Sequence, residues 1–180
     1  MRLGLAISVL VIGVSLIAAR PAHADIAAAW AQGQGGMTNA PSESGAAMGG
    51  LGFQLGARLL LFEGYLDHTA FGEGASVTRG VFGLRGALGG RDTRLVLRGG
   101  VGAIQDQSGA LTGRDPGLPE RRGGVARAGV ALETHLAPLL LAGLGIDGER
   151  FVLANPGPDA GYTQGSDIFG SLHLMFELGI

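Results

Sequence analysis

The sequence contains no cysteine and no lysine, and it is poor in charged and aromatic residues. Its 13 cationic residues are all arginine, charged residues make up 16% of the chain and aromatic residues 6%. Without cysteine the chain has no disulfide framework and no thiolate chemistry. Arginine pairs bidentately with carboxylates in confined places, where a lysine ammonium keeps its water more firmly. The choice of cation therefore favours ion pairs away from bulk water.

The chain is nevertheless strongly apolar. Of its 180 residues, 46% are hydrophobic and 35 are glycine, and its mean hydropathy is positive. This suits one domain, but it is too apolar and too rich in glycine for an ordinary soluble one. Beyond the N-terminal region no run approaches the length of a membrane-spanning helix. Strands closed into a barrel are then the remaining way to be embedded in a membrane.

Residues 1–24 are interpreted as a secretory signal peptide. Arg2 gives the charged start, an apolar run follows from Leu3 to Ala19, and Ala22-His23-Ala24 is a small-x-small cleavage motif. The alternative is an N-terminal membrane anchor, for which the run is near the short end. The mature chain is expected to span residues 25–180. The acidic residues of the mature chain outnumber its arginines. We therefore expect no basic surface and no nucleic-acid partner.

Residues 25–180 contain eight candidate strands in which apolar and polar positions alternate with period two. The connections between them alternate between tight turns and longer loops, which is typical of bacterial outer-membrane barrels with periplasmic termini. A long strand at the end of the chain needs a partner on both edges, and closure supplies it. We therefore predict an eight-stranded antiparallel up-and-down transmembrane β-barrel. The strands are predicted at residues 25–34, 45–58, 60–70, 76–89, 92–106, 121–136, 138–153 and 165–180.

One parity of these strands is apolar and the other carries the charges. In the last strand Leu172 and Leu174 fall on the first parity, and His173 and Glu177 on the second. We expect the apolar parity to face lipid and the charged parity to face the lumen. A soluble carrier like the lipocalins would have the reverse arrangement and is the alternative. The candidate lumen network consists of Arg58, Glu63, Asp67, Arg79, Arg85, Arg94, Arg98, Arg127, Glu133, Asp147, Glu149, Asp167 and Glu177.

The balance of these charges predicts a closed lumen. Six arginines face seven acids, and an eight-stranded barrel has an interior just wide enough for side chains to fill. Paired charges would satisfy one another there, because an unpaired buried charge costs several kcal/mol. The alternative is a narrow channel for ions or small solutes.

The predicted signal peptide, the strand pattern and the final strand resemble the small eight-stranded outer-membrane β-barrel proteins, the group that includes the OmpA transmembrane domain and OmpX. The resemblance covers the whole mature chain and is one of pattern. It implies a monomer in the lipid of a Gram-negative outer membrane, with the barrel-assembly machinery as a partner during biogenesis. The signal that this chain presents to the machinery would be Leu174, Phe176, Leu178 and Ile180, although such proteins usually end on an aromatic residue.

The resemblance also implies aromatic residues at the membrane interfaces and external loops for a surface partner. Candidates for the interfaces are Trp30, Phe71, Phe151 and Tyr162, which lie near the ends of predicted strands. The longer external loops are residues 107–120 and 154–164. We expect a structural or surface-interaction role.

Catalytic candidates are few. Ser171, His173 and Glu177 share the last strand, and Glu133 and His135 share another. A lipid-modifying barrel enzyme similar to the lipid A deacylases would present such residues toward lipid, whereas these fall on the charged parity. We therefore expect no catalytic site. With four histidines in all, one of them in the signal, and no metal-binding motif, we expect no metal or cofactor.

Overall fold

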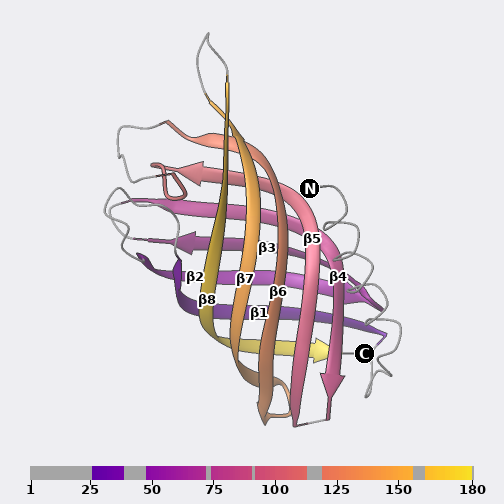
Figure 1. Cartoon of the computed structure of the whole chain (residues 1–180). Helices are drawn as coiled ribbons and strands as arrows, with labels where there is room; N and C mark the ends of the chain where they lie inside the picture. The colour runs from indigo at the N-terminus through magenta and orange to yellow at the C-terminus, as the bar shows by residue number, and fades with distance from the viewer. Residues whose placement is uncertain are drawn as a thin grey trace.

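The structure, a computed structural model, is a closed barrel of eight antiparallel strands (Figure 1). It describes residues 26–38, 48–71, 74–90, 92–112, 119–155 and 161–179. The predicted signal peptide and Ile180 lie outside the described residues. No described segment forms a helix with the length and apolarity needed to span a membrane.

Each strand pairs with the next one in the chain, and the first pairs with the last. The predicted up-and-down barrel is thus confirmed. Its strands are β1 (Ala27–Thr38), β2 (Met48–Leu59), β3 (Phe62–Ala70), β4 (Ser76–Gly89), β5 (Thr93–Gln107), β6 (Arg121–Ala137), β7 (Leu140–Ala154) and β8 (Tyr162–Gly179).

Two strands extend clearly beyond their predicted bounds. β1 continues to Thr38 instead of ending at residue 34, and β8 begins at Tyr162 instead of residue 165. Thr38 pairs with Met48 on one side and with Phe169 on the other. The glycine-rich end of β1 is therefore held in the sheet by its two neighbours, although its own sequence has no clear alternation.

The tight turns gather at one end of the barrel, which we call the turn end, and the longer connections at the other, the loop end (Figure 1). At the turn end Leu60 and Leu61 join β2 to β3. The amide of Leu60 donates to the carbonyl of Ile26 at 2.8 Å, and the amide of Arg85 donates to the carbonyl of Leu61 at 2.8 Å. Both bonds tie this turn to neighbouring chain segments.

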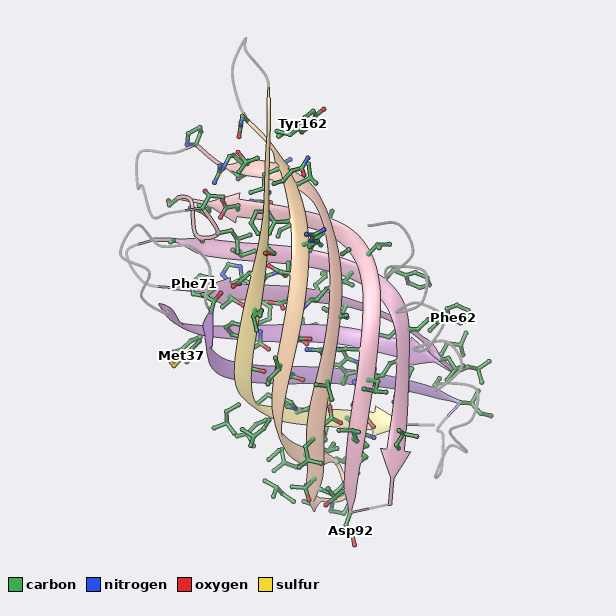
Figure 2. All side chains as sticks on the ribbon, in the orientation of Figure 1. Met37, Phe62, Phe71, Asp92 and Tyr162 are labelled. Carbon is green, nitrogen blue, oxygen red and sulfur yellow. The ribbon has the colours of Figure 1, made fainter. Side chains whose placement is uncertain are left out.

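The two faces of the strands differ sharply in chemistry. The outer face carries large exposed apolar side chains on every strand, among them Leu132 and Leu144. Figure 2 shows Met37 and Phe62 pointing away from the barrel. Leu174, Phe176 and Leu178 of the expected assembly signal also lie on this outer face. The inner face holds the buried charged side chains.

Several inward-facing glycines make room for large side chains that lie along the barrel wall. At Gly56 a Cβ atom would collide with the indole ring of Trp30 and would stand 2.9 Å from the Cβ of Tyr65. The rings of Trp30 and Tyr65 are 5.9 Å apart and tilted against each other. The absence of a side chain at Gly56 is thus what seats this aromatic pair.

Replacing Gly56 with alanine should destabilise the barrel, because the indole ring has to leave its place. We expect a loss of about 1–3 kcal/mol in the free energy of unfolding, the usual cost of overpacking. The matched control is Gly33→Ala on the outer face of β1, where nothing lies within 4 Å of the added atom. Urea unfolding of both variants checks this, and equal effects would contradict it.

Candidate functional site in the barrel interior

Among the described residues, most ion pairs inside the barrel fall into two groups. The group nearer the turns, here the turn-end cluster, joins residues from β2, β3, β4, β5, β6 and β8. Its members are Arg58, Glu63, Arg85, Arg94, Glu133 and Glu177.

Shared carboxylates hold the turn-end cluster together. Glu133 accepts from Arg94 Nε at 2.7 Å and from Arg85 Nη2 at 3.0 Å. Glu177 accepts from Arg94 Nη2 at 2.9 Å, and Arg58 approaches it to 3.8 Å. Because each of these carboxylates meets two guanidinium groups, no single pair can part without disturbing the next.

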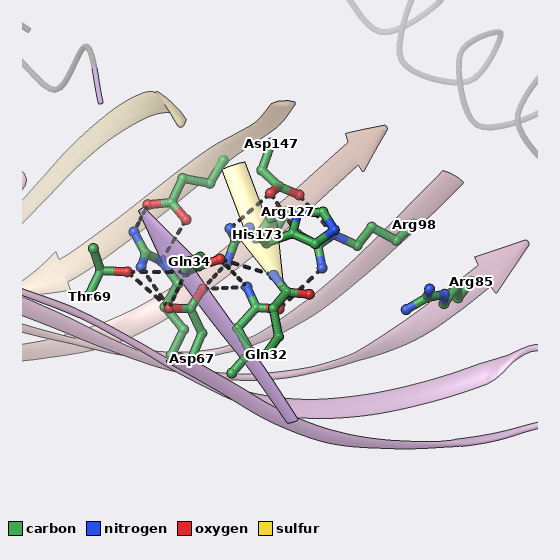
Figure 3. Close-up of polar contacts among 12 residues, drawn as sticks. Gln32, Gln34, Asp67, Thr69, Arg85, Arg98, Arg127, Asp147 and His173 are labelled. Carbon is green, nitrogen blue, oxygen red and sulfur yellow. Dashed lines mark hydrogen bonds and ion pairs between the residues drawn. The ribbon is translucent and has the colours of Figure 1, made fainter. Parts of the chain in front are cut away.

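The second group, the central cluster, comprises Asp67, Arg79, Arg98, Arg127, Asp147 and Glu149. Figure 3 shows four of them, Asp67, Arg98, Arg127 and Asp147, together with their polar contacts. Glu149 receives two hydrogen bonds from Arg79, at 2.7 and 2.8 Å. Asp147 receives two from Arg98, at 2.9 and 2.7 Å. Such bidentate pairs are the strongest ion pairs that arginine forms with a carboxylate.

Arg127 connects the central cluster by donating to Asp67 at 2.6 Å and to Asp147 at 3.1 Å. Amide side chains fill the remaining places: Gln54 donates to Asp67 at 3.1 Å and accepts from Arg98 at 3.3 Å. Gln34, from β1, accepts from Gln54 at 3.2 Å. The glutamines of β1 were not among the predicted site residues because their strand shows only a weak alternation in sequence.

The structure brings twelve of the thirteen predicted lumen residues into these two clusters. The exception is Asp167. Its carboxyl group is buried nearer the loop end, and among the described residues it joins neither cluster through an ion pair. The sequence pattern selected the inward-facing charges by parity and predicted that Arg85, Arg98 and Arg127 would face Glu133, Asp147 and Glu177, but it did not assign each charge its own partner.

The catalytic candidates do not form a catalytic arrangement. Ser171 and His173 both face inward from β8, and no hydrogen bond joins their side chains among the described contacts. Nε2 of His173 lies 3.8 Å from Glu133, which is already held by two arginines. A nucleophile activated by hydrogen bonding to a base is thus not seen here. Within the described residues, no three histidine or acidic side chains are grouped to hold a metal ion.

The loop end of the interior holds a group of large apolar side chains that the sequence pattern did not reveal. Buried side chains from several strands and from the β5–β6 connection meet there. We call this group the apolar lid, and it comprises Phe71, Val77, Ile104, Leu111, Val125, Phe151, Leu153 and Phe169. Most of these residues have the same parity as the buried charges of their strands, and that shared parity was the signal that could have placed them inside.

The prediction of an interface position is therefore wrong for three of the four aromatic residues. Phe71 and Phe151 are 2% exposed and belong to the apolar lid, and Trp30 is buried against Tyr65. Tyr162 alone of the four is exposed, at 73%. Nearness to a strand end suggested an interface, but the side on which each side chain emerges decided its surroundings.

A short latch holds part of the β5–β6 connection in the mouth of the barrel. Ser108 and Gly109 have positive φ angles of 56° and 63°, which turn the chain after β5. Asp106 then accepts from the amide of Leu111 at 3.2 Å and from Arg121 at 2.6 Å. Arg121 also donates to the hydroxyl of Thr112. The fully buried Leu111 is thereby fixed inside the lid.

Two solved structures are similar to this chain. The N-terminal β-barrel domain of OprF from Pseudomonas aeruginosa has a TM-score of 0.56 at 12% identity, covering 84% of this chain and 97% of that one. The fold is that of outer-membrane β-barrels. Neisserial surface protein A has a TM-score of 0.51 at 10% identity, covering 86% of this chain and 97% of that one. No family model and no curated protein matches the chain.

Removing one arginine of the central cluster should destabilise the barrel strongly. In Arg127→Ala, Asp67 and Asp147 each lose a cation while staying buried, and breaking such a pair costs about 3–5 kcal/mol. The control is Arg122→Ala: this side chain is 76% exposed and pairs with Glu120 on the surface, where a pair contributes about 1 kcal/mol or less. Thermal or urea unfolding in detergent measures both, and a mild effect at Arg127 would show that the cluster does not depend on it.

Proposed function

We propose that this protein is an integral β-barrel of the outer membrane of a Gram-negative bacterium, with a lumen closed by ion pairs and a structural or surface-interaction role. The observation that carries this proposal is the inverted arrangement of the central barrel. Its charged side chains are buried inside, while leucine, isoleucine, valine and phenylalanine side chains stand exposed around the outside.

An aqueous surrounding does not suit this outer face. Soluble monomers rarely expose a contiguous apolar patch larger than a few hundred Å², whereas here exposed apolar side chains occur on every strand. Lipid does suit it, since a closed barrel satisfies all the backbone hydrogen-bonding groups of its strands internally. A lipocalin-like carrier would keep its apolar residues inside and is therefore disfavoured.

The ion pairs support a closed lumen because several of them cross it. Arg79 on β4 binds Glu149 on β7, and Arg127 on β6 binds Asp67 on β3. In each pair the two strands are three apart in a barrel of eight, so these side chains reach from wall to wall. The apolar lid then closes the loop end. An open channel would require both the crossing ion pairs and the apolar lid to move aside.

The surface-interaction role is assigned to the loop end. The predicted partner loops 107–120 and 154–164 begin and end in described strands, although their central residues lie outside the described part of the chain. At the opposite end, Leu174, Phe176 and Leu178 face outward on β8, the strand that closes the barrel with β1. This is where the barrel-assembly machinery would meet its signal. We expect a monomer, since closure leaves β1 and β8 paired with each other.

A membrane barrel should resist denaturation on a gel and tolerate no charge in the middle of its apolar band. Unboiled protein should migrate faster than boiled protein, because the folded barrel is more compact.

Leu132→Arg should cost about 2–4 kcal/mol in lipid, the cost of a cation near the midplane of a membrane barrel. Gln105→Arg, on the outer face nearer the loop end, is the control. Folding of the purified chain in water without detergent or lipid would refute the proposal.

The closed lumen makes a separate prediction. Wild-type protein in planar bilayers should show little steady conductance, because the wall-to-wall ion pairs and the apolar lid occupy the path. Arg98→Ala opens space beside Asp147 and should raise the conductance above that of wild type. Large, stable and ion-selective currents from wild type would instead support the channel alternative.

A further inference from the structure

The outer and inner faces exchange character at the loop end. On β4, Ser76 and Thr78 face outward on either side of the buried Val77. On β7 the exposed Arg150 precedes the buried Phe151. At these positions polar side chains lie outside and apolar ones inside, as in a protein surrounded by water, although Val152, next to Phe151, is also exposed.

Polar contacts across the outer face support this reversal. Ser76 donates to Gln107 at 3.4 Å between β4 and β5. His68 and Thr78 are hydrogen-bonded at 2.9 Å between β3 and β4. Arg122, Gln164 and Ser166 are exposed on β6 and β8 at the same end. Figure 1 shows β7 and β8 rising beyond the other strands here, with Tyr162 near the top of this projection in Figure 2.

At the opposite end, two of the three turns expose apolar side chains instead of polar ones. Leu59, Leu60, Leu61 and Phe62 are all more than half exposed, and they form the β2–β3 turn. Water-exposed turns usually carry glycine, asparagine or aspartate. Leu60 even has a φ of 56°, a conformation that bulky residues seldom adopt.

The β6–β7 turn repeats this composition, with Leu136 and Leu139 exposed. The β4–β5 turn is different, since it contains Gly90 and Asp92. Figure 2 shows Asp92 at the tip of the barrel. Near it the hydroxyls of Thr93 and Thr134 bond to each other at 3.2 Å, and the hydroxyl of Thr134 also donates to the carbonyl of Asp92 at 2.9 Å.

We infer that the bilayer covers this barrel asymmetrically: it reaches the leucines of the β2–β3 and β6–β7 turns and stops short of the loop end, which stands in water as a head around its own apolar core. The inference rests on the proposed membrane location and specifies which surface meets lipid. On β8 the boundary falls between Ile168, which is apolar and exposed, and Ser166. On β4 it falls between Phe82 and Thr78. The apolar lid is then the core of the head as well as the seal of the lumen.

The absence of cysteine makes a direct test available, because any introduced cysteine is unique. Single variants Ser166→Cys, Leu172→Cys, Leu60→Cys, Leu139→Cys and Asp92→Cys are reconstituted in phosphatidylcholine vesicles. A charged maleimide is loaded on both sides of the membrane, so that orientation does not matter. The same variants unfolded in hot detergent give the reference rates.

We expect Ser166→Cys and Asp92→Cys to react at rates close to the unfolded reference. The reaction should be at least about tenfold slower than the unfolded reference for Leu172→Cys, Leu60→Cys and Leu139→Cys. An apolar environment raises the thiol pKa and so removes the reactive thiolate. The gel-migration assay shows which variants are folded. If a variant fails to fold, Leu61→Cys replaces a turn variant and Gln164→Cys replaces Ser166→Cys.

Two results would overturn the inference while leaving the membrane location intact. Fast reaction at both Leu60→Cys and Leu139→Cys would place the turns in water, and slow reaction at Ser166→Cys would place the loop end in lipid. Fast reaction at Leu172→Cys has a different meaning. It would show that the middle of the barrel is not embedded at all, and the proposed function would fail with it.

Discussion

The hydrogen-bonded pairing of β1 with β8 closes the sheet, and the rest of the structure depends on that closure. Eleven residue pairs, from Ala28 with Gly179 to Thr38 with Phe169, join the two strands. Once they are joined, every strand has a neighbour on both sides and the sheet has one inside and one outside. The interior of eight strands is only wide enough for side chains. Whatever faces inward must therefore pack against, or pair with, something else that faces inward.

Nearly all the charge in this narrow interior is paired, and Asp167 is the exception among the described lumen residues. Taking a carboxylate or a guanidinium out of water costs several kcal/mol per ion, and good geometry with further hydrogen bonds is needed to offset it. The central cluster meets this condition through the bidentate pairs of Arg79 and Arg98. Arginine suits such pairs better than lysine because its planar fork matches two carboxylate oxygens. The exclusive use of arginine in this chain agrees with that requirement.

The inner face of the barrel changes character along its length. Toward the turns the inside is charged and the outside apolar, and at the loop end the inside is the apolar lid. The latch of Asp106 and Arg121 fixes the start of the β5–β6 connection in the mouth. Polar groups at the mouth thus hold a group of apolar side chains beside the charged part of the interior. Glycines such as Gly56 provide the space that the large inward side chains need along the wall.

Sequence alone determined the number of strands, their antiparallel order and the parity of nearly every charged residue, because period two is a local property of the backbone. Leu174 and His173 had to fall on opposite faces in any strand that contains both. Only the tertiary structure decided the partners of each charge, since Arg127 and Asp67 are separated by 60 residues and meet across the closed interior. It also decided that Trp30 packs against Tyr65 and that Phe71 and Phe151 meet in the apolar lid, because contacts between strands depend on register and closure, and neither is encoded in a single strand.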